Sequence, residues 1–315
     1  MKIVVGIPFT QAQKQRLSHS AAGASISYVS WDTANVEEIR KANIIMGNIP
    51  LAMLREAKAL QWLQLDSSGA SQYCTKGVLP DAVALTNASG AYGEAVSEVM
   101  LAFTMALFKK LYRYLDNQRA SLWKDEGQVC SPVNAVILVL GTGDIGRAYA
   151  RKMRALGSYV IGIRRHGREH ADGFDEIGAI TELDAFLGRA DLVAVALPGT
   201  KETAGLLDEK RLRQMKRGAY LLNVGRGNII APSDLQKIME EGYLSGAALD
   251  VTDPEPLPED HPLWHTPGVW ITPHVAGGFH LDLTLDNIAG ICCENLDRFL
   301  ARRDLLHQVD RNQEY

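Results

Sequence analysis

The sequence predicts an α/β protein built from two doubly wound parallel-sheet domains. Two observations lead to this class: short apolar runs of strand length alternate with helical segments along the chain, and one glycine-rich turn connects an apolar strand to an amphipathic helix. Strands that alternate with helices are joined by crossovers, which makes the sheets parallel. A chain of 315 residues has room for about two domains of ordinary size.

The N-terminal region predicts the first sheet, because apolar strands and helical segments alternate over roughly its first ninety residues. The strands are expected at residues 2–6, 26–29, 44–46, 62–65 and 82–85. A long amphipathic helix is then expected over residues 93–117. A C-terminal helix over residues 285–300 is expected to fold back onto this first region.

The second region predicts a second sheet, whose strands are again separated by helical or turn segments. These strands are expected at residues 135–140, 159–163, 192–197, 219–224, 246–249 and 269–271. In open parallel sheets, ligands bind beyond the carboxyl ends of the strands. Polar residues that directly follow these strands are therefore candidates for chemistry.

The most informative segment is the glycine-rich turn at residues 141–146, which follows an apolar strand and opens an amphipathic helix. In this context the three glycines are typical of dinucleotide binding. Gly141 permits a tight exit from the strand, Gly143 lets a pyrophosphate approach the backbone, and Gly146 lets helix and sheet pack closely. Unpaired N–H groups at the helix start attract phosphate. The cofactor-binding residues expected here are Gly141, Thr142, Gly143, Asp144, Ile145 and Gly146.

The end of the next strand distinguishes the two nicotinamide dinucleotides. An NAD site usually has an Asp or Glu there, about 20 residues beyond the glycines, which binds the ribose 2′-hydroxyl. This chain has Arg164 and Arg165 instead, followed by Arg168, and no acidic residue occurs between residues 157 and 169. We therefore expect NADP(H), with NAD(H) possible, since a charge-assisted hydrogen bond to the 2′-phosphate contributes about 1.5–3 kcal/mol. A solvated basic loop is the alternative.

The composition argues against several function classes. A formal net charge of -4 gives no electrostatic basis for binding nucleic acid or an anionic membrane. No apolar run approaches membrane-spanning length, and the N-terminus lacks the apolar segment of a signal peptide. The four cysteines have neither zinc nor C-x-x-C spacing, so we expect reduced thiols, a cytoplasmic protein and no bound metal.

Three polar residues that follow strands of the second sheet are candidates for chemistry, namely Arg226, Asp250 and His274. Arg226 lies between two glycines, which free the backbone to aim its guanidinium from the end of a buried strand. A guanidinium suits bidentate binding of a carboxylate and also polarises an adjacent ketone. A structural ion pair at a turn is the alternative for this residue taken alone.

His274 is a candidate acid–base group, because proline and glycine residues fix and open the turn around it. Hydride transfer between a nicotinamide and a carbonyl carbon requires a proton at the carbonyl oxygen. The acidic loop at residues 250–258 offers a carboxylate that would orient the imidazole and stabilise its charged form. Spacing alone leaves both Asp253 and Glu255 open for this role. An ordinary core or surface histidine is the alternative.

These segments, taken together and in this order, resemble the D-isomer-specific 2-hydroxyacid dehydrogenase family over essentially the whole chain. The matching stretches are residues 63–70, 141–146, 190–198, 215–227, 246–258 and 272–277. The resemblance implies a Rossmann NAD(P)-binding domain, residues 98–284, inserted into a split flavodoxin-like substrate domain, residues 1–97 and 285–315. It also implies a homodimer formed through the nucleotide domain.

The resemblance implies roles for individual residues. Arg226 looks like the substrate-anchoring arginine, Glu255 like the acid that pairs with histidine, and His274 like the proton donor. Asp250 resembles the group that holds the nicotinamide carboxamide. The residues that look like the loop binding the substrate carboxylate through backbone N–H groups are Ser68, Gly69 and Ala70. Further residues implied at the cofactor are Leu197, Pro198, Thr203, Val224, Gly225, Arg226, His274 and Gly277.

Some positions depart from the family pattern or narrow it. Arg164 stands where the family usually has an acid, and in this respect the chain resembles the NADP-using glyoxylate/hydroxypyruvate and 2-oxoacid reductases. Thr252 stands where an aromatic residue is frequent. Glu255 argues against formate dehydrogenase, in which glutamine takes the role of the acid.

The sequence as a whole predicts an NADPH-dependent reductase that converts small 2-oxo acids into D-2-hydroxy acids. One alternative is a non-catalytic nucleotide-sensing module, like the transcriptional corepressors that share this fold. Another is a phosphoglycerate-type dehydrogenase, which would need basic residues near the substrate loop, and residues 65–73 contain none. Which 2-oxo acid is physiological, and in which direction the reaction runs, stay open.

Overall fold

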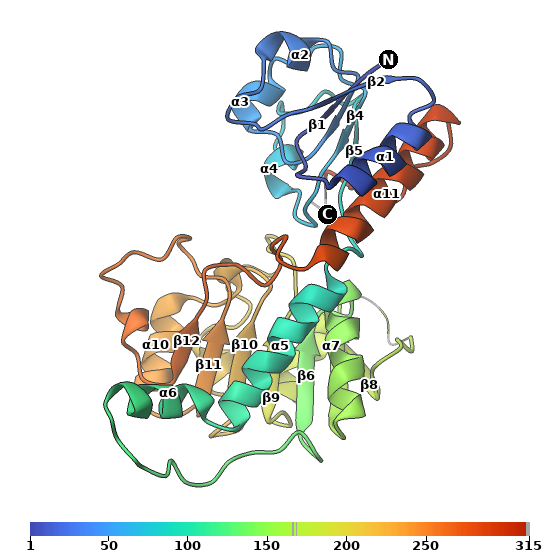
Figure 1. Ribbon diagram of the computed structural model, residues 1–315. Helices are drawn as coiled ribbons and strands as arrows, with labels where there is room; N and C mark the ends of the chain where they lie inside the picture. Colours follow the sequence, from blue (N-terminus) through green and yellow to red (C-terminus); the bar gives the residue numbers. More distant parts are fainter. Residues whose placement is uncertain (166, 168, 313–315) are drawn as a thin grey trace. The chain divides into compact units, whose positions relative to one another are not determined.

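The chain divides into two compact units in the computed structural model, which describes residues 1–165, 167 and 169–312 (Figure 1). Unit 1 consists of Met1–Tyr92 and Phe279–Tyr315, and unit 2 consists of Gly93–Gly278. Arg168, which the sequence analysis counted with Arg164 and Arg165, lies outside the described residues. Each unit contains a parallel sheet, so the predicted α/β class with two parallel-sheet domains is confirmed.

Unit 1 contains a five-stranded parallel sheet in the order β2-β1-β3-β4-β5. Its strands are β1 (Lys2–Val5), β2 (Ser25–Tyr28), β3 (Ile44–Met46), β4 (Trp62–Gln64) and β5 (Ala84–Thr86). Its helices are α1 (Gln11–Ser20), α2 (Val36–Arg40), α3 (Leu51–Leu54), α4 (Ser71–Cys74) and α11 (Asp282–Leu300). The C-terminal helix α11 packs against α1, and Asn295 on it donates a hydrogen bond to buried Gln64 of β4 at 2.9 Å. The last helix therefore completes the unit that the first residues begin.

Unit 2 contains a seven-stranded parallel sheet in the order β12-β11-β10-β9-β6-β7-β8. Its strands are β6 (Val136–Leu140), β7 (Tyr159–Arg164), β8 (Glu176–Ala179), β9 (Leu192–Val195), β10 (Tyr220–Asn223), β11 (Gly246–Leu249) and β12 (Val269–Ile271). Its helices are α5 (Gly93–Phe108), α6 (Leu111–Arg119), α7 (Asp144–Ala155), α8 (Leu183–Leu187), α9 (Glu209–Leu212) and α10 (Pro232–Glu240), with 3₁₀ turns at Ile180–Glu182, Gly227–Ile229 and Pro262–Trp264. The chain proceeds outward from β6 on both sides, which makes the carboxyl ends of β6 and β9 the expected place for a ligand.

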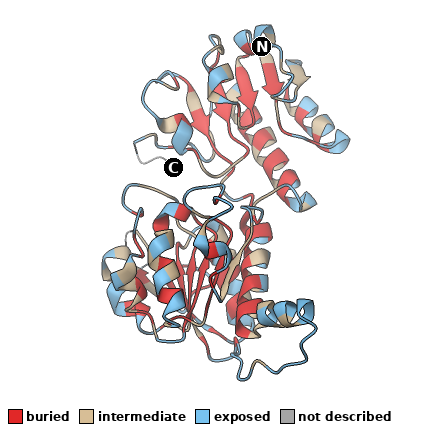
Figure 2. Cartoon of the chain, turned by 90° about the vertical axis from the view of Figure 1, so that its left-hand side faces the viewer, coloured by how far each residue is buried: buried red, intermediate tan, exposed pale blue. Residues whose placement is uncertain are grey.

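The central strands of both sheets are buried along their length (Figure 2). Helices cover the faces of a parallel sheet, so its strands are apolar throughout, and these unbroken runs are what made the strands predictable. Such buried strands form a rigid frame that fixes the polar residues following their carboxyl ends. Among the described residues, no helix is both long and apolar enough to cross a membrane.

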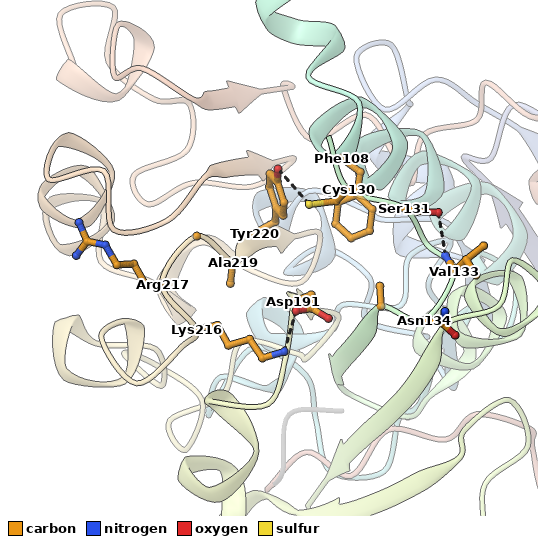
Figure 3. Close-up of a pocket in the computed structure, with 12 residues that line it drawn as sticks. Phe108, Cys130, Ser131, Val133, Asn134, Asp191, Lys216, Arg217, Ala219 and Tyr220 are labelled. Carbon is orange, nitrogen blue, oxygen red and sulfur yellow. Dashed lines mark hydrogen bonds and ion pairs between the residues drawn. The ribbon is translucent and has the colours of Figure 1, made fainter. Parts of the chain in front are cut away.

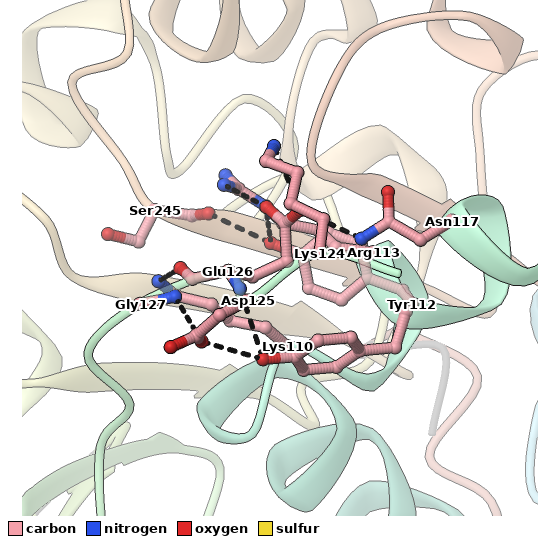
Figure 4. A network of polar contacts seen from close by, with 10 residues as sticks. Lys110, Tyr112, Arg113, Asn117, Lys124, Asp125, Glu126, Gly127 and Ser245 are labelled. Atoms are coloured by element: carbon pink, nitrogen blue, oxygen red, sulfur yellow. Dashed lines mark hydrogen bonds and ion pairs between the residues drawn. The ribbon is translucent and has the colours of Figure 1, made fainter. Parts of the chain in front are cut away.

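The single helix predicted over residues 93–117 is wrong, because α5 ends at Phe108 and α6 begins at Leu111. Lys110, between them, adopts a left-handed backbone conformation with a φ of 55°. Its ammonium group donates to the carbonyl oxygen of Glu126 at 2.5 Å (Figure 4). The Glu126 carboxylate accepts from Asn117 at 2.8 Å, so polar contacts hold the extended segment that follows α6.

Strand β8 is not among the predicted strands, because its sequence Glu-Ile-Gly-Ala has neither an apolar run nor a clear alternation. It pairs with β7 at the edge of the sheet. The domain boundary expected near residue 97 falls inside α5, which contacts α7, β10 and β11 and lies wholly in unit 2. The boundary expected at residues 284–285 falls inside α11, which lies wholly in unit 1.

Candidate active site

The glycine-rich turn lies at the carboxyl end of β6 and leads into α7. Gly141 has a φ of 108°, and a Cβ there would lie 2.6 Å from the carbonyl oxygen of Ala196, just beyond β9. A Cβ on Gly146 would lie 1.9 Å from the Gly141 carbonyl oxygen, so only glycine lets the helix start this close to the strand. Nothing lies within 4 Å of a Cβ added to Gly143, where the turn is open. These residues fit a pyrophosphate at the N-terminus of α7.

The side chains within this turn pack on neighbouring elements of unit 2. A Cβ added to Gly162 of β7 would lie 2.7 Å from the Thr142 methyl carbon, and one added to Gly93 would lie 2.4 Å from Asp144 Oδ1. The Asp144 carboxylate therefore lies against the start of α5. Ile145, the next residue, is half-buried. A ligand at this turn would therefore contact mainly backbone atoms.

The carboxyl end of β7 carries Arg164, its last residue, and Arg165 directly after it. The Nη2 atom of Arg165 lies 2.7 Å from Oε2 of Glu202, which belongs to the segment after β9. The local sequence contains no acid near this strand end, yet the fold brings one there from a distant segment. The end of β7 thus combines basic groups with a carboxylate, and this is the strand end at which NAD- and NADP-binding domains of this fold usually differ.

The segment after β9 contains Leu197, Pro198 and Thr203, which the resemblance implied at the cofactor. The Thr203 hydroxyl is buried and donates to the carbonyl oxygen of Pro198 at 2.6 Å, and it accepts from the Thr200 N–H at 2.8 Å. The side chain of Thr203 therefore braces this segment. A Cβ on Gly225 would lie 2.6 Å from the Leu197 carbonyl oxygen, so the segments after β9 and β10 approach closely.

Arg226 follows β10 after the buried residue Val224 and Gly225. Buried Asn223 fixes this turn, since it accepts from the Gly225 N–H at 3.0 Å and donates to the Arg226 carbonyl oxygen at 3.0 Å. Burial lowers the pKa of the Arg226 guanidinium from its usual value, and the nearby Glu255 carboxylate opposes that change. Among the described residues, no carboxylate lies within 4.0 Å of this guanidinium. Its charge is therefore available to an anionic ligand.

Asp250 follows β11 and braces the turn after β12. Its carboxylate accepts from the Thr272 hydroxyl at 2.6 Å and from the N–H groups of Val275 and Ala276 at 3.0 Å each. Its carbonyl oxygen accepts from the His274 N–H at 2.8 Å. Asp250 is 2% exposed, so these contacts replace the water that its charge would otherwise need. They hold the turn that carries His274 and continues into Gly277.

The histidine of this turn pairs with Glu255, whose Oε1 lies 2.5 Å from His274 Nδ1. The structure therefore brings Glu255, and not Asp253, to the imidazole. His274 has a left-handed backbone conformation, with a φ of 52°, which the Asp250 contacts hold. Its side chain is 43% exposed, and the contact with Glu255 engages Nδ1 and not Nε2. A carboxylate at Nδ1 orients the ring and stabilises the imidazolium.

Unit 1 carries the loop Ser68, Gly69 and Ala70 after β4. In the part of the chain that the structure describes, the N–H groups of these residues have no hydrogen-bond partner in the protein. The loop is held by other groups: the Ser67 hydroxyl donates to the Gly69 carbonyl oxygen at 2.8 Å, and Asn87 donates to that of Ser68 at 2.9 Å. Open N–H groups on a fixed loop suit an anion such as a carboxylate.

Directly before this loop, Asp66 is 8% exposed. Its carboxylate accepts the backbone N–H groups of Asn48 and of Asp66 itself, but burial outweighs them and raises the pKa of Asp66 to about 6. The Tyr92 hydroxyl donates to its carbonyl oxygen. A buried acid thus lies beside the candidate anion-binding loop.

A hollow of about 290 Å³ lies elsewhere in unit 2 (Figure 3). Its lining includes Ala135, Asp191 and Tyr220, which precede or begin β6, β9 and β10. Lys216 and Asp191 form an ion pair there at 2.8 Å. The hollow is therefore at the amino ends of the strands, the edge opposite Arg226 and His274, and it contains none of the candidate site residues.

Several residues with a part in this geometry are absent from the sequence-based set. Asp66 obeys the rule that found Arg226 and His274, since it is polar and follows a strand, so the signal was present. Asn223 and Thr272 act through local hydrogen bonds at strand ends. Glu202 has no local signal, because two strands, β8 and β9, and helix α8 separate it in the sequence from its partner Arg165.

Comparison with protein families gives a match over residues 101–276 to the model described as D-isomer specific 2-hydroxyacid dehydrogenase, NAD binding domain. A curated relative, glyoxylate/hydroxypyruvate reductase A from Serratia proteamaculans, is 33% identical over 216 residues, which cover 68% of this chain and 68% of the relative.

Solved structures resemble the whole chain. A D-isomer specific 2-hydroxyacid dehydrogenase family protein from Aeromonas salmonicida is 30% identical, with a TM-score of 0.87 over 98% of this chain and 99% of that one. A D-isomer specific 2-hydroxyacid dehydrogenase from Xanthobacter autotrophicus, in complex with NADPH and MES, is 25% identical, with a TM-score of 0.84 over 100% of this chain and 99% of that one.

Proposed function

Because the chain belongs to the D-isomer-specific 2-hydroxyacid dehydrogenase family, we propose that it is an NADPH-preferring reductase that converts small 2-oxo acids into D-2-hydroxy acids. The chain is an oxidoreductase, and its family comprises NAD(P)-dependent 2-hydroxyacid dehydrogenases and glyoxylate reductases. The observation that carries the finer proposal is the Glu255–His274 pair, whose carboxylate acts on the partly buried guanidinium of Arg226.

Arg226 binds the substrate in this proposal. Its guanidinium forms bidentate hydrogen bonds with the carboxylate of the 2-oxo acid and polarises the adjacent ketone. As negative charge develops on the ketone oxygen, the fixed positive charge stabilises it, and such a group typically contributes about 10²–10³-fold to the rate. The loop Ser68, Gly69 and Ala70 keeps the role that the resemblance implies, which is to bind the carboxylate through backbone N–H groups.

His274 supplies the proton. With Nδ1 held by Glu255, the protonated ring donates from Nε2 to the ketone oxygen, and the carboxylate stabilises the imidazolium before that transfer. NADPH, when bound, supplies the hydride that adds to the carbonyl carbon. The ketone thereby gains one hydride and one proton and becomes the alcohol, and His274 is left neutral. Asp250 holds the histidine turn, and its role toward the nicotinamide carboxamide is part of the same proposal.

The cofactor is held by the residues described above. The Gly141–Gly146 turn would bind the pyrophosphate, and Arg164 and Arg165 would bind the 2′-phosphate of NADPH. The structure of the relative from Xanthobacter autotrophicus contains NADPH, which supports this preference. The segment Leu197–Thr203 and residues Val224, Gly225 and Gly277 would line the rest of the site.

We also propose that the protein forms a homodimer through unit 2. Several large apolar side chains are exposed on α6 and the segment after it, and Trp123 is 103% exposed. These residues are Leu111, Leu115, Leu122, Trp123, Val129 and Val133. Exposed apolar patches of this kind typically mark an interface. Light scattering coupled to size exclusion should give the mass of a dimer, and Trp123→Glu should shift it toward the monomer.

The reaction is tested by measuring kcat/KM with NADPH and with NADH. The substrates are glyoxylate, hydroxypyruvate, pyruvate and a bulkier 2-oxo acid. We expect turnover that favours NADPH, and the best acid identifies the size of the side-chain pocket. Binding of a dinucleotide without turnover of any 2-oxo acid would contradict the proposed function.

A further inference from the structure

The pair formed by Arg165 and Glu202 lies where the proposed function puts the distinguishing group of the cofactor. The two residues follow β7 and β9, which are the strands on either side of β6. Their 2.7 Å contact therefore connects the segments that flank the glycine-rich turn. Neither side chain is deeply buried, with 35% exposure for Arg165 and 65% for Glu202, so a ligand can reach both.

The two dinucleotides differ only at the adenosine ribose, where NADPH has a 2′-phosphate and NADH has a hydroxyl. A phosphate monoester carries a charge of about -1.5 to -2 at neutral pH, so it acts mainly as a hydrogen-bond acceptor and is attracted by cations. A carboxylate beside it is repulsive, and it also competes for the same guanidinium. A ribose hydroxyl, in contrast, donates to a carboxylate, which is how an acid at this place favours NADH.

We propose that Glu202 is the ribose-recognising acid of this protein and that it limits the preference for NADPH over NADH. The inference rests on the proposed function. Glu202 takes the place of the acid that the sequence lacks between residues 157 and 169, although it comes from a different segment. Arg164 and Arg165 favour the 2′-phosphate, and Glu202 opposes it, so the protein binds both dinucleotides.

The test is equilibrium binding of NADPH and of NADH to the full chain, measured by titration calorimetry without substrate. In Glu202→Gln the repulsion is removed and the guanidinium of Arg165 no longer pairs with a carboxylate at residue 202. Exposed ion pairs contribute about 0.2–1 kcal/mol, so the ratio of the NADH Kd to the NADPH Kd should rise by up to about fivefold. The rise should shrink at high salt, because exposed charges are screened.

Glu241→Gln is the matched control. Glu241 is an exposed acid that pairs with Arg213 at 2.8 Å in the same unit, so the substitution removes the same charge and a similar contact. The ratio of Kd values should stay that of the wild type. Adenosine 2′,5′-bisphosphate, which carries only the distinguishing end of NADPH, should bind Glu202→Gln more tightly than the wild type.

A ratio that stays unchanged in Glu202→Gln overturns this inference alone. A ratio that falls overturns it too, because Glu202 would then position Arg165 for the phosphate. A wild-type protein that binds neither dinucleotide would overturn the proposed function together with the inference.

Discussion

Each unit buries one aspartate just after a strand, and the two aspartates have opposite surroundings. Asp250 of unit 2 is 2% exposed and its carboxylate accepts three hydrogen bonds, from Thr272, Val275 and Ala276. Asp66 of unit 1 is 8% exposed and accepts only backbone N–H groups, so burial raises its pKa to about 6. The same residue type at the same edge of a parallel sheet thus braces a catalytic turn in one unit and carries an energetic penalty in the other.

This difference indicates how the units divide the chemistry. In unit 2, side chains at strand ends are fixed by neighbours, which suits groups that must hold a proton or a charge at one place. In unit 1, the loop after Asp66 carries backbone N–H groups that have no partner among the described residues, which suits binding of an anion. Substitution of either aspartate tests this division of roles.

The largest effect is expected for Asp250→Ala. The substitution leaves three donors without their acceptor: the Thr272 hydroxyl, the part-buried N–H group of Val275 and the buried N–H group of Ala276. An unsatisfied buried donor costs about 1–3 kcal/mol, so the free energy of unfolding should fall by about 3 kcal/mol or more. Urea denaturation at pH 7 measures this loss. A loss below about 1 kcal/mol would show that the carboxylate does not brace the turn.

Asp66→Asn should raise the free energy of unfolding at neutral pH, whereas Asp250→Ala should lower it. Because the pKa of Asp66 rises from 3.8 to about 6, the folded state keeps a proton that the unfolded chain has already lost. Wild-type stability therefore falls as pH rises from about 4 to about 6, and the full penalty, about 3 kcal/mol, remains at higher pH. Thermal denaturation should show the variant to be more stable than the wild type at pH 8 and equal to it below pH 4. A variant that is less stable at pH 8 would contradict this account of Asp66.

Glu255→Gln should lower kcat by about tenfold to a hundredfold and leave the Kd for NADPH unchanged. Glutamine still accepts a hydrogen bond from Nδ1 but no longer stabilises the imidazolium that donates the proton. Steady-state kinetics with the best 2-oxo acid, together with a binding titration, separates the two effects. Asp253→Asn is the matched control in the same loop, and an equal loss of kcat there would remove the special role of Glu255.

Much of the fold could be predicted, because buried parallel strands are unbroken apolar runs and the glycine spacing has one structural meaning in its context. The rule that polar residues follow strands found Arg226 and His274, although it left Asp253 and Glu255 undecided. The break at Lys110 and edge strand β8 have weak local signals, since both depend on contacts with other segments. Glu202 shows the same limit at the site: its contact with Arg165 joins loops on either side of β6, which no local pattern encodes.

The central claim is that His274 transfers the proton, and His274→Asn tests it most directly. Asparagine tolerates the left-handed backbone that His274 adopts, so the turn should persist. We expect the variant to bind NADPH as the wild type does, while kcat for 2-oxo acid reduction falls by about 10²–10⁴-fold. A variant that binds NADPH and keeps near-normal turnover would contradict the account.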